Sequence, residues 1–314
     1  MNLNLAEEAL EVGAVLEDTI AAAGGLALLR AAVDDPDARG AAQRLLDDFG
    51  VWGLQPLEDR VELEVAAAVC RAAGTYALPY PVVERLAAGG GAARALVATE
   101  GDRVADHADL DLAWSGIDLR GAVYDLSAPR RIEGAVLAPF ACRVEASPTG
   151  ETAPASAALA ATLQAWWLSG LLQRAVDETV RYAREREQFG RPLIRFQGVS
   201  FTLADMTVEV EALRELSKYT LWTLAEAPSV ALTEALGLRL AALRAAHVVL
   251  RGAQQLHGAM GFTHEVDVSW LSRASQTARR VCGGQHATSV LLEESVRAAG
   301  WHPFGQPARP SAVG

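Results

Sequence analysis

A turn between two long helical segments constrains the fold of this chain more than any other feature. Residues 181–197 contain Gly190, which can take the left-handed conformation that closes a helix, and Pro192, which a continuing helix does not accommodate. Downstream, apolar residues recur at spacings of four and three and form one helix face: Val199, Leu203, Met206, Val210 and Leu213. We therefore expect two packed helices joined at this turn.

The C-terminal half predicts a helix bundle. Helical spacing runs over about 156–187, 196–226, 229–258 and 284–299, and four amphipathic helices of this kind pack into a bundle. The first is apolar on much of its circumference because of Trp166, Trp167, Leu171, Leu172 and Val176. Its aromatic pair belongs either in the core of the bundle or, in addition, at a contact between subunits.

The N-terminal half predicts helices followed by a small β region. Helical spacing covers 16–33, 41–49, 61–72 and 82–88, with a break at 34–37. Short apolar runs at 113–116, 121–126 and 134–144 predict strands, and the turn-rich residues 147–155 predict a linker. We assign an N-terminal helical domain to 1–98, a shortened β domain with linker to 99–152, a four-helix bundle to 153–300 and a tail to 301–314.

Composition and charge argue against two classes of partner. The chain has 314 residues, a formal net charge of −11 and no long run of Lys or Arg. Neither nucleic acid nor an anionic membrane surface therefore attracts it. No run approaches about 20 uninterrupted apolar residues, and the N-terminus lacks a signal-like pattern, so we expect a soluble, cytoplasmic protein. Cys70, Cys142 and Cys282 stand singly, which fits neither a disulfide framework nor a Cys-x-x-Cys metal site.

Two sequence blocks resemble the signature of flavin-dependent acyl-CoA dehydrogenases. The first is Arg186-Glu-Gln-Phe-Gly190, followed by Phe196-Gln197 and Leu203-Ala-Asp-Met206. The second is Gln255-Leu-His-Gly258-Ala-Met-Gly261, followed by Leu271-Ser-Arg273. Their order and separation match the family. The resemblance implies a mainly α fold with an N-terminal helical domain, a reduced middle β region and a C-terminal four-helix bundle, and it implies FAD as cofactor.

The resemblance also assigns residues to part of the FAD site. In the family, the two blocks reach the adenine-diphosphate portion of the FAD held by a neighbouring subunit; the matching residues here are Arg186, Gln188, Phe189, Gln255 and Gly258. Arginine supplies fixed donors for a diphosphate, phenylalanine a flat apolar surface, and glycine close backbone approach. Ala259 replaces the family's second glycine. The alternative is that Arg186 only ends a helix and that Phe189 is a core residue.

The catalytic glutamate of the family is missing. That residue removes the α-proton of the acyl-CoA thioester, and the ungapped continuation places Cys282 at its position. The position that some relatives use instead, on the first bundle helix, lies near Ala160 and Ala161, where no carboxylate is present. An ordinary thiol has a pKa near about 8.5, so Cys282 is a poor base at neutral pH unless its surroundings lower that value. We assign no catalytic residue.

The other carboxylate and the histidines of this region do not form a predicted base or metal site. Glu265 occupies a position where the family's glutamate is usually structural. His257, His264 and His286 lack the His-x-x-x-His spacing of common zinc sites, so no metal site is predicted.

The combined pattern resembles the non-catalytic subunits of heteromeric acyl-CoA dehydrogenases of steroid degradation. The β region lacks both family motifs that cover the flavin ring. The resemblance implies an α2β2 heterotetramer in which a catalytic partner subunit shares the FAD and binds most of the acyl-CoA substrate. Two alternatives stay open: a self-sufficient flavoenzyme with an unconventional base, Cys282 or a histidine, and a flavin-free interaction protein of the same fold.

Overall fold

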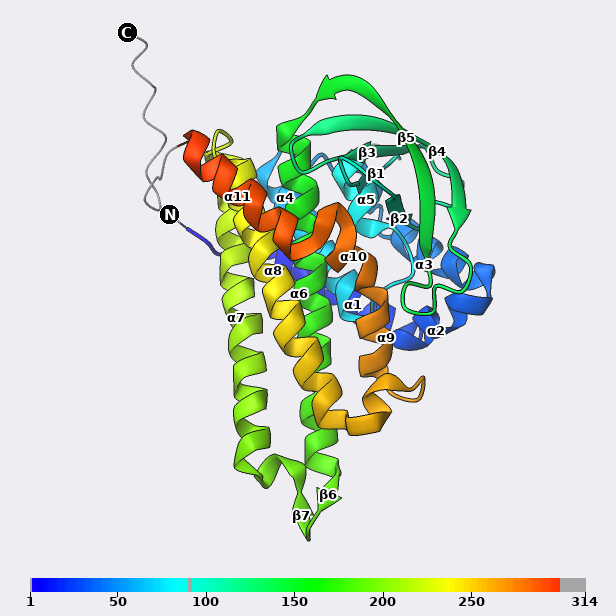
Figure 1. The fold of residues 1–314 in the computed structure, drawn as a ribbon, viewed down its shortest axis with the longest axis vertical. Helices are drawn as coiled ribbons and strands as arrows, with labels where there is room; N and C mark the ends of the chain where they lie inside the picture. Colours follow the sequence, from blue (N-terminus) through cyan, green and yellow to red (C-terminus); the bar gives the residue numbers. More distant parts are fainter. Residues whose placement is uncertain (1, 90–91, 300–314) are drawn as a thin grey trace.

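A bundle of four long helices dominates the computed structural model, which describes residues 2–89 and 92–299. The helices run vertically or obliquely in Figure 1: α6 (Pro154–Glu185), α7 (Gln197–Glu226), α8 (Ala231–His257) and α11 (Gly284–Ala299). Each begins and ends within two residues of the range predicted from helical spacing. The mainly α fold with a C-terminal four-helix bundle is therefore confirmed.

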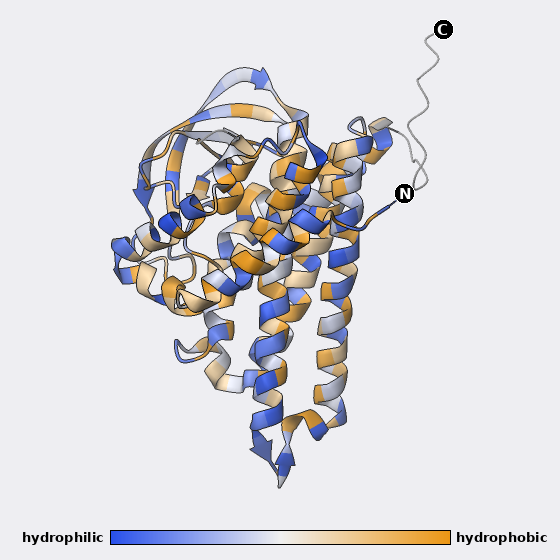
Figure 2. Ribbon diagram, turned by 180° about the vertical axis from the view of Figure 1, so that it is seen from behind, coloured by the Kyte–Doolittle hydropathy of each residue, from blue (hydrophilic) through white to orange (hydrophobic). Residues whose placement is uncertain are grey.

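Helix α6 is the core of the molecule. Leu163 and Leu171 are fully buried and Trp166 is 2% exposed, because α4, α7 and α8 surround α6. By length and composition α6 could cross a membrane, but 83% of its most apolar window is buried inside the fold. Figure 2 shows hydrophobic residues where the helices face one another and hydrophilic residues on the outer faces. The apolar circumference of α6 is thus explained by its central position.

Two glycines fix how the N-terminal helices dock on the bundle. A Cβ atom at Gly74 of α4 (Arg60–Thr75) would lie 1.9 Å from the carbonyl oxygen of Trp167, and one at Gly170 would lie 2.1 Å from that of Arg71. Both values are far below any real contact, so α4 and α6 cross with their backbones touching.

The other N-terminal elements are α1 (Glu7–Ala22), α2 (Leu26–Asp34), α3 (Pro36–Asp48), the 3-10 turn η1 (Val51–Gly53) and α5 (Val82–Ala88). The prediction of one helix over 16–33 was wrong, because Gly24 and Gly25 adopt positive φ angles of 121° and 55° and break it. The predicted break at 34–37 is present. There the Asp35 side chain accepts a hydrogen bond from the Asp37 amide at 2.9 Å and caps α3.

Five strands form one sheet in the order β1-β3-β4-β5-β2, with β1 parallel to β3 and the other pairs antiparallel. They are β1 (Ala93–Leu96), β2 (Arg103–Asp106), β3 (Trp114–Ile117), β4 (Ala122–Arg131) and β5 (Ala141–Thr152). β1 packs on α5, and β2 on the short helix α10 (Gln276–Arg280). The sheet therefore lies beside the upper part of the bundle in Figure 1.

The sequence located this sheet only in part. Strands β1 and β2 were not predicted, and β1 precedes the boundary placed at residue 99. The predicted strand over 134–144 was mostly wrong, since β5 starts at Ala141. The predicted linker over 147–155 was also wrong: β5 continues through Thr152, which pairs with Ala122. Cross-strand pairing overrides the turn preference of these residues. The tail assigned to 301–314 lies outside the described residues.

Candidate functional site

The first signature block forms a hairpin that extends the end of α6. Strand β6 (Glu187–Gln188) pairs with β7 (Arg191–Pro192), and Phe189 and Gly190 form the two-residue turn with φ angles of 53° and 77°. Two successive positive φ angles are typical of the type I′ hairpin turn. Helix α6 ends earlier, at Glu185. The left-handed conformation expected at Gly190 is present, but it closes a hairpin and not a helix.

Hydrogen bonds hold this hairpin to the helix end. The Arg186 amide donates to the Tyr182 carbonyl oxygen, and the Leu193 amide donates to the Arg186 carbonyl oxygen, both at 2.8 Å. The Arg191 guanidinium lies 4.1 Å from the centre of the Phe196 ring. The hairpin and the short 3-10 turn η2 (Leu193–Arg195) therefore form a defined projection at the lower end of the bundle (Figure 1).

The projection exposes the side chains that sequence reasoning assigned to a cofactor. Arg186 and Gln188 are exposed, and Phe189 is 92% exposed, so Phe189 is not a core residue. Its one ring contact is edge-to-face with Phe196, at 6.2 Å between centres, among the described residues. An exposed phenylalanine at positive φ is unfavourable both sterically and in hydration, whereas Asn-Gly is the preferred pair for this turn. Folding alone gives no reason for Phe189.

The second block lies at the same end of the bundle. Gln255 is exposed on the last turn of α8, and Gly258 follows it in the 3-10 turn η3 (Gly258–Phe262). Gly258 has φ 62° and ψ −141°, a conformation that is nearly restricted to glycine. The ring of His257 stacks on Tyr182 at 4.3 Å between centres, and this contact joins the two block regions. Ala259 has no positive φ, so its backbone accepts the methyl group.

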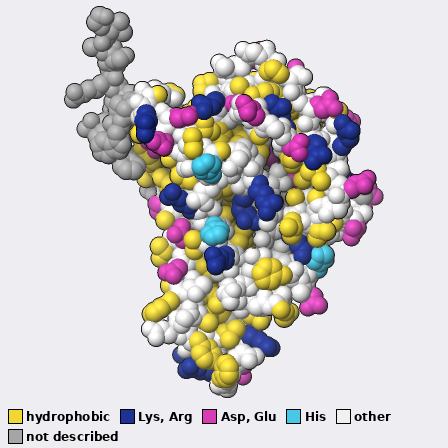
Figure 3. Space-filling view, in the orientation of Figure 1, with side chains coloured by type: hydrophobic (Ala, Val, Ile, Leu, Met, Phe, Trp, Pro, Cys, Tyr) yellow, Lys and Arg dark blue, Asp and Glu magenta, His cyan; other side chains and the backbone are white. Residues whose placement is uncertain are grey.

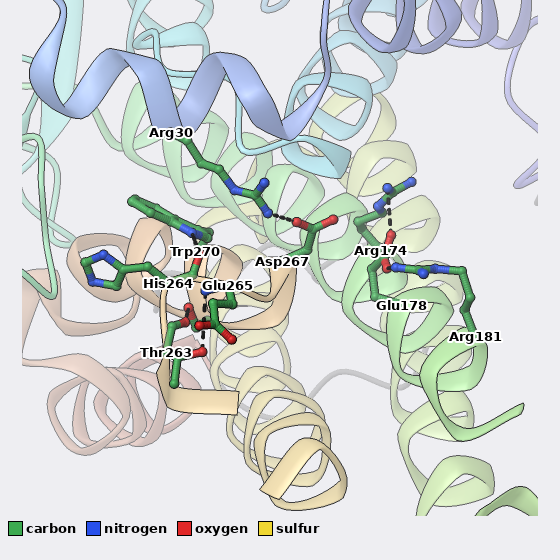
Figure 4. Close-up of polar contacts among 10 residues, drawn as sticks. Arg30, Arg174, Glu178, Arg181, Thr263, His264, Glu265, Asp267 and Trp270 are labelled. Carbon is green, nitrogen blue, oxygen red and sulfur yellow. Dashed lines mark hydrogen bonds and ion pairs between the residues drawn. The ribbon is translucent and has the colours of Figure 1, made fainter. Parts of the chain in front are cut away.

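The loop after η3 places the other candidate groups of this block. Trp270 of α9 (Asp267–Ala274) donates from Nε1 to the His264 carbonyl oxygen at 2.9 Å, as Figure 4 shows, and Asp267 pairs with Arg30 of α2. The Glu265 side chain is exposed on this loop. His257 is buried in α8, whereas His264 and His286 are exposed. Among residues 2–89 and 92–299, no group of three or more His, Cys, Asp or Glu side chains is arranged to hold a metal ion.

An ion-pair cluster stiffens the end of α6 next to the hairpin. Glu178 is buried and pairs with Arg174 at 2.7 Å and with Arg181 (Figure 4). Arg181 also lies 3.6 Å from Glu185. The Arg181 guanidinium is therefore paired with carboxylates of its own helix. The guanidinium of Arg186, in contrast, makes no hydrogen bond or ion pair within the described part of the chain.

Cys282, which the sequence resemblance predicts to occupy the family's base position, is held as a thiol. Cys282 lies in the 3-10 turn η4 (Val281–Gly283) with φ 56°, and its Sγ donates to the Val97 carbonyl oxygen at 3.1 Å. Burial, opposed by the Arg239 guanidinium and assisted by the Asp118 carboxylate, raises the pKa of this thiol to about 11. A protonated thiol that already donates a hydrogen bond is unsuited to proton abstraction at neutral pH.

A carboxyl pair that sequence reasoning missed lies at the junction of α5, β2 and α10. Glu84 and Asp106 line a cavity of about 60 Å³, and the Thr277 hydroxyl donates to Asp106 at 2.7 Å. Burial raises the pKa of each carboxyl group to about 7, and the Asp106 charge adds to the effect on Glu84. Burial, assisted by the Arg39 charge, lowers the pKa of His107 beside them to about 3. The cavity has room for a few water molecules but not for an acyl thioester. The only sign of this site in the sequence is Glu84, a single acidic residue within the mostly apolar stretch 82–88.

Comparison with known proteins gives a family match and a set of curated relatives. Residues 156–289 match the model of the acyl-CoA dehydrogenase C-terminal domain. The 3-sulfinopropanoyl-CoA desulfinase of Paraburkholderia xenovorans is 38% identical over 104 residues, which are 33% of this chain and 26% of that protein. The matched part thus spans about a quarter of the length of this curated relative.

Solved structures share the fold over almost the whole chain. The ChsE4-ChsE5 complex from Mycobacterium tuberculosis has a TM-score of 0.76 at 19% identity, covering 95% of this chain and 99% of that chain. A variant of the Tcur3481-Tcur3483 steroid ACAD has a TM-score of 0.72 at 19% sequence identity, and the match covers 93% of this chain and 98% of that chain. The FAD complex of PigA has a TM-score of 0.69 at 14% sequence identity, and the match covers 96% of this chain and 100% of that chain. At these identities the likeness concerns the fold.

Proposed function

Because this chain carries the C-terminal domain of the acyl-CoA dehydrogenase family at residues 156–289 and has the fold of that family, we propose that it is the non-catalytic subunit of a heteromeric acyl-CoA dehydrogenase. In this role it completes the adenine-diphosphate part of an FAD site on a catalytic partner subunit. Bound FAD would supply the hydride acceptor for α,β-dehydrogenation of an acyl-CoA thioester.

The exposed hairpin tip carries this proposal. Phe189 is 92% exposed at a positive φ, although asparagine would suit the turn better. The fold thus maintains an unfavourable side chain on a rigid projection, and contact with another molecule would offset that cost. An exposed aromatic ring gains about 1.5–3 kcal/mol when fully buried.

The neighbouring groups fit a dinucleotide. The guanidinium of Arg186 is exposed beside Phe189 and has no partner among the described residues, so its donors are free for a diphosphate. Gln188 and Gln255 add amide groups, and at Gly258 the backbone is open to solvent, with nothing within 4 Å of the position a Cβ would take. These side chains bind and orient the cofactor; none of them moves a proton.

The internal groups argue against a self-sufficient enzyme. The Cys282 thiol has a raised pKa and donates a hydrogen bond to the Val97 carbonyl oxygen. The only internal carboxyl pair with pKa values near about 7, Glu84 and Asp106, faces a cavity of about 60 Å³ within the part of the chain that the structure describes. A catalytic base and most of the acyl-CoA site would therefore come from the partner.

Two of the solved neighbours, the ChsE4-ChsE5 complex and the Tcur3481-Tcur3483 steroid ACAD, support a role beside a partner subunit. By analogy, we assign this chain to a cytoplasmic α2β2 heterotetramer that acts on acyl-CoA thioesters, with steroid side-chain CoA esters as the leading substrate class.

Co-expression with a catalytic acyl-CoA dehydrogenase subunit tests the proposal. We expect a purified complex with one FAD per pair of unlike chains, measured by flavin absorbance against protein concentration. Arg186→Ala should weaken FAD retention about tenfold or more, because a charge-assisted hydrogen bond is lost.

Arg184→Ala is the matched control, because Arg184 is exposed on the same helix end. It lies outside the proposed FAD clamp, which consists of Arg186, Gln188, Phe189, Gln255 and Gly258. The control variant should leave FAD retention unchanged. One FAD per chain, equal effects of the two variants, or a stable complex without FAD would each contradict the shared-site proposal.

A further inference from the structure

A basic pocket of about 380 Å³ opens between α8, α9 and α10. Three arginines from three different elements line it: Arg251, Arg273 and Arg279. No aspartate or glutamate lines it among the described residues, although the chain carries a net charge of −11. Figure 3 shows Lys and Arg side chains gathered near the middle of this face, with histidine nearby. None of the five residues of the proposed FAD clamp lines this pocket.

The three guanidinium groups have no counter-ion within the described ranges. Arg273 is 8% exposed and donates from Nη2 to the Phe262 carbonyl oxygen at 3.2 Å. Arg279 donates to the Ser275 hydroxyl and to the Ser272 carbonyl oxygen, each at 3.1 Å. Arg251 is exposed and makes no hydrogen bond or ion pair there. Every acceptor is neutral, so the positive charge of the pocket is not balanced.

The arrangement is costly without an anion. Burial lowers the pKa of Arg273, and burial together with the charge of neighbouring Arg280 lowers that of Arg279 to about 10. Buried charges are normally paired, and a pair of close like charges is repulsive. An anion in the pocket would relieve both effects and raise these pKa values again.

We propose that this pocket binds an organic diphosphate, such as the diphosphate of a nucleotide. Three forked guanidinium groups on separate elements can donate hydrogen bonds to several phosphate oxygens at once. A ligand with a single carboxylate would use only part of these donors. The volume lies in the usual range for small-ligand pockets. Phe262 lines the pocket and is 66% exposed, so it offers an apolar surface to a base, and Gln254 offers an amide.

Titration calorimetry of the purified full chain with sodium pyrophosphate and with ADP tests this site. We expect both probes to bind, with a Kd that rises as salt is added. Arg251→Gln should raise the Kd about tenfold or more, since one charge-assisted contact is lost and the exposed position tolerates glutamine. Arg244→Gln is the matched control: Arg244 is exposed on the same helix, outside the pocket, and its replacement should leave the Kd unchanged.

Tighter binding of ADP than of pyrophosphate, abolished by Phe262→Ser, would support a nucleotide ligand. Equal binding of the two probes would support a site for the diphosphate alone. Absence of heat with both probes, or equal weakening by Arg244→Gln and Arg251→Gln, would overturn the proposal. The measurement uses neither a partner subunit nor FAD, so its failure is distinguishable from failure of the shared-site function.

Discussion

Replacement of Asp106 by asparagine tests the electrostatics of the internal carboxyl cavity. Burial raises the pKa of Asp106 from 3.8 to about 7 in the folded chain. The folded state therefore favours the protonated form, and the stabilisation that this provides is complete below pH about 4 and is lost as the pH rises through 7. Asparagine keeps the size of the side chain and still accepts the hydrogen bond from Thr277, but it does not titrate.

The magnitude follows from the two pKa values. A single group with this shift removes about 2–3 kcal/mol from the free energy of unfolding between pH 5 and pH 8, because each pKa unit corresponds to a little over 1 kcal/mol. Asp106→Asn should match the wild type only at pH about 4 and below, and its advantage in stability should grow from pH 5 to pH 8. Glu84 has a raised pKa of its own, so the variant keeps part of the pH dependence.

Urea unfolding followed by circular dichroism at pH 5, 6, 7 and 8 measures the effect. Asp125→Asn is the control, because Asp125 is an exposed carboxylate on β4 and its loss changes the net charge equally. Equal pH slopes for the wild type and Asp106→Asn would refute the reasoning, as would an equal flattening by Asp125→Asn.

Three further predictions address the catalytic position, the hairpin and the helix crossing. In the complex, Cys282→Ala should leave turnover nearly unchanged; a loss of about 10²-fold or more would identify a base and contradict the shared-site function. Phe189→Asn should preserve the thermal unfolding temperature of the isolated chain, because Asn-Gly suits the turn, yet lower FAD retention by the complex; unchanged retention would count against the clamp. Gly170→Ala should destabilise the chain by about 2 kcal/mol or more in urea unfolding, since its Cβ would lie 2.1 Å from a carbonyl oxygen. Gly237→Ala is the control: nothing lies within 4 Å of its Cβ position, so this change should stabilise the chain by about 0.5–1 kcal/mol. Equal effects of the two variants would be inconsistent with the close crossing of α4 and α6.

The hairpin at 187–192 shows which structural features the sequence pattern could predict and which it could not. Gly190 and Pro192 marked the end of a helix, and the left-handed conformation at Gly190 is present. The sequence could not show that α6 stops at Glu185 and that two short strands follow, because this depends on pairing between Gln188 and Arg191. Nor could it decide whether Phe189 is buried, since exposure is set by which elements pack nearby.

The sequence by itself determined the four bundle helices to within two residues at each end and the two signature blocks, because helical periodicity and motif spacing are local properties of a chain. Only the tertiary structure decided the extent of the sheet, the paired carboxyl groups of Glu84 and Asp106, and the shared pocket of Arg251, Arg273 and Arg279. Each of these brings together residues from separate elements. Their burial and charge balance arise from packing between those elements, which no local pattern records.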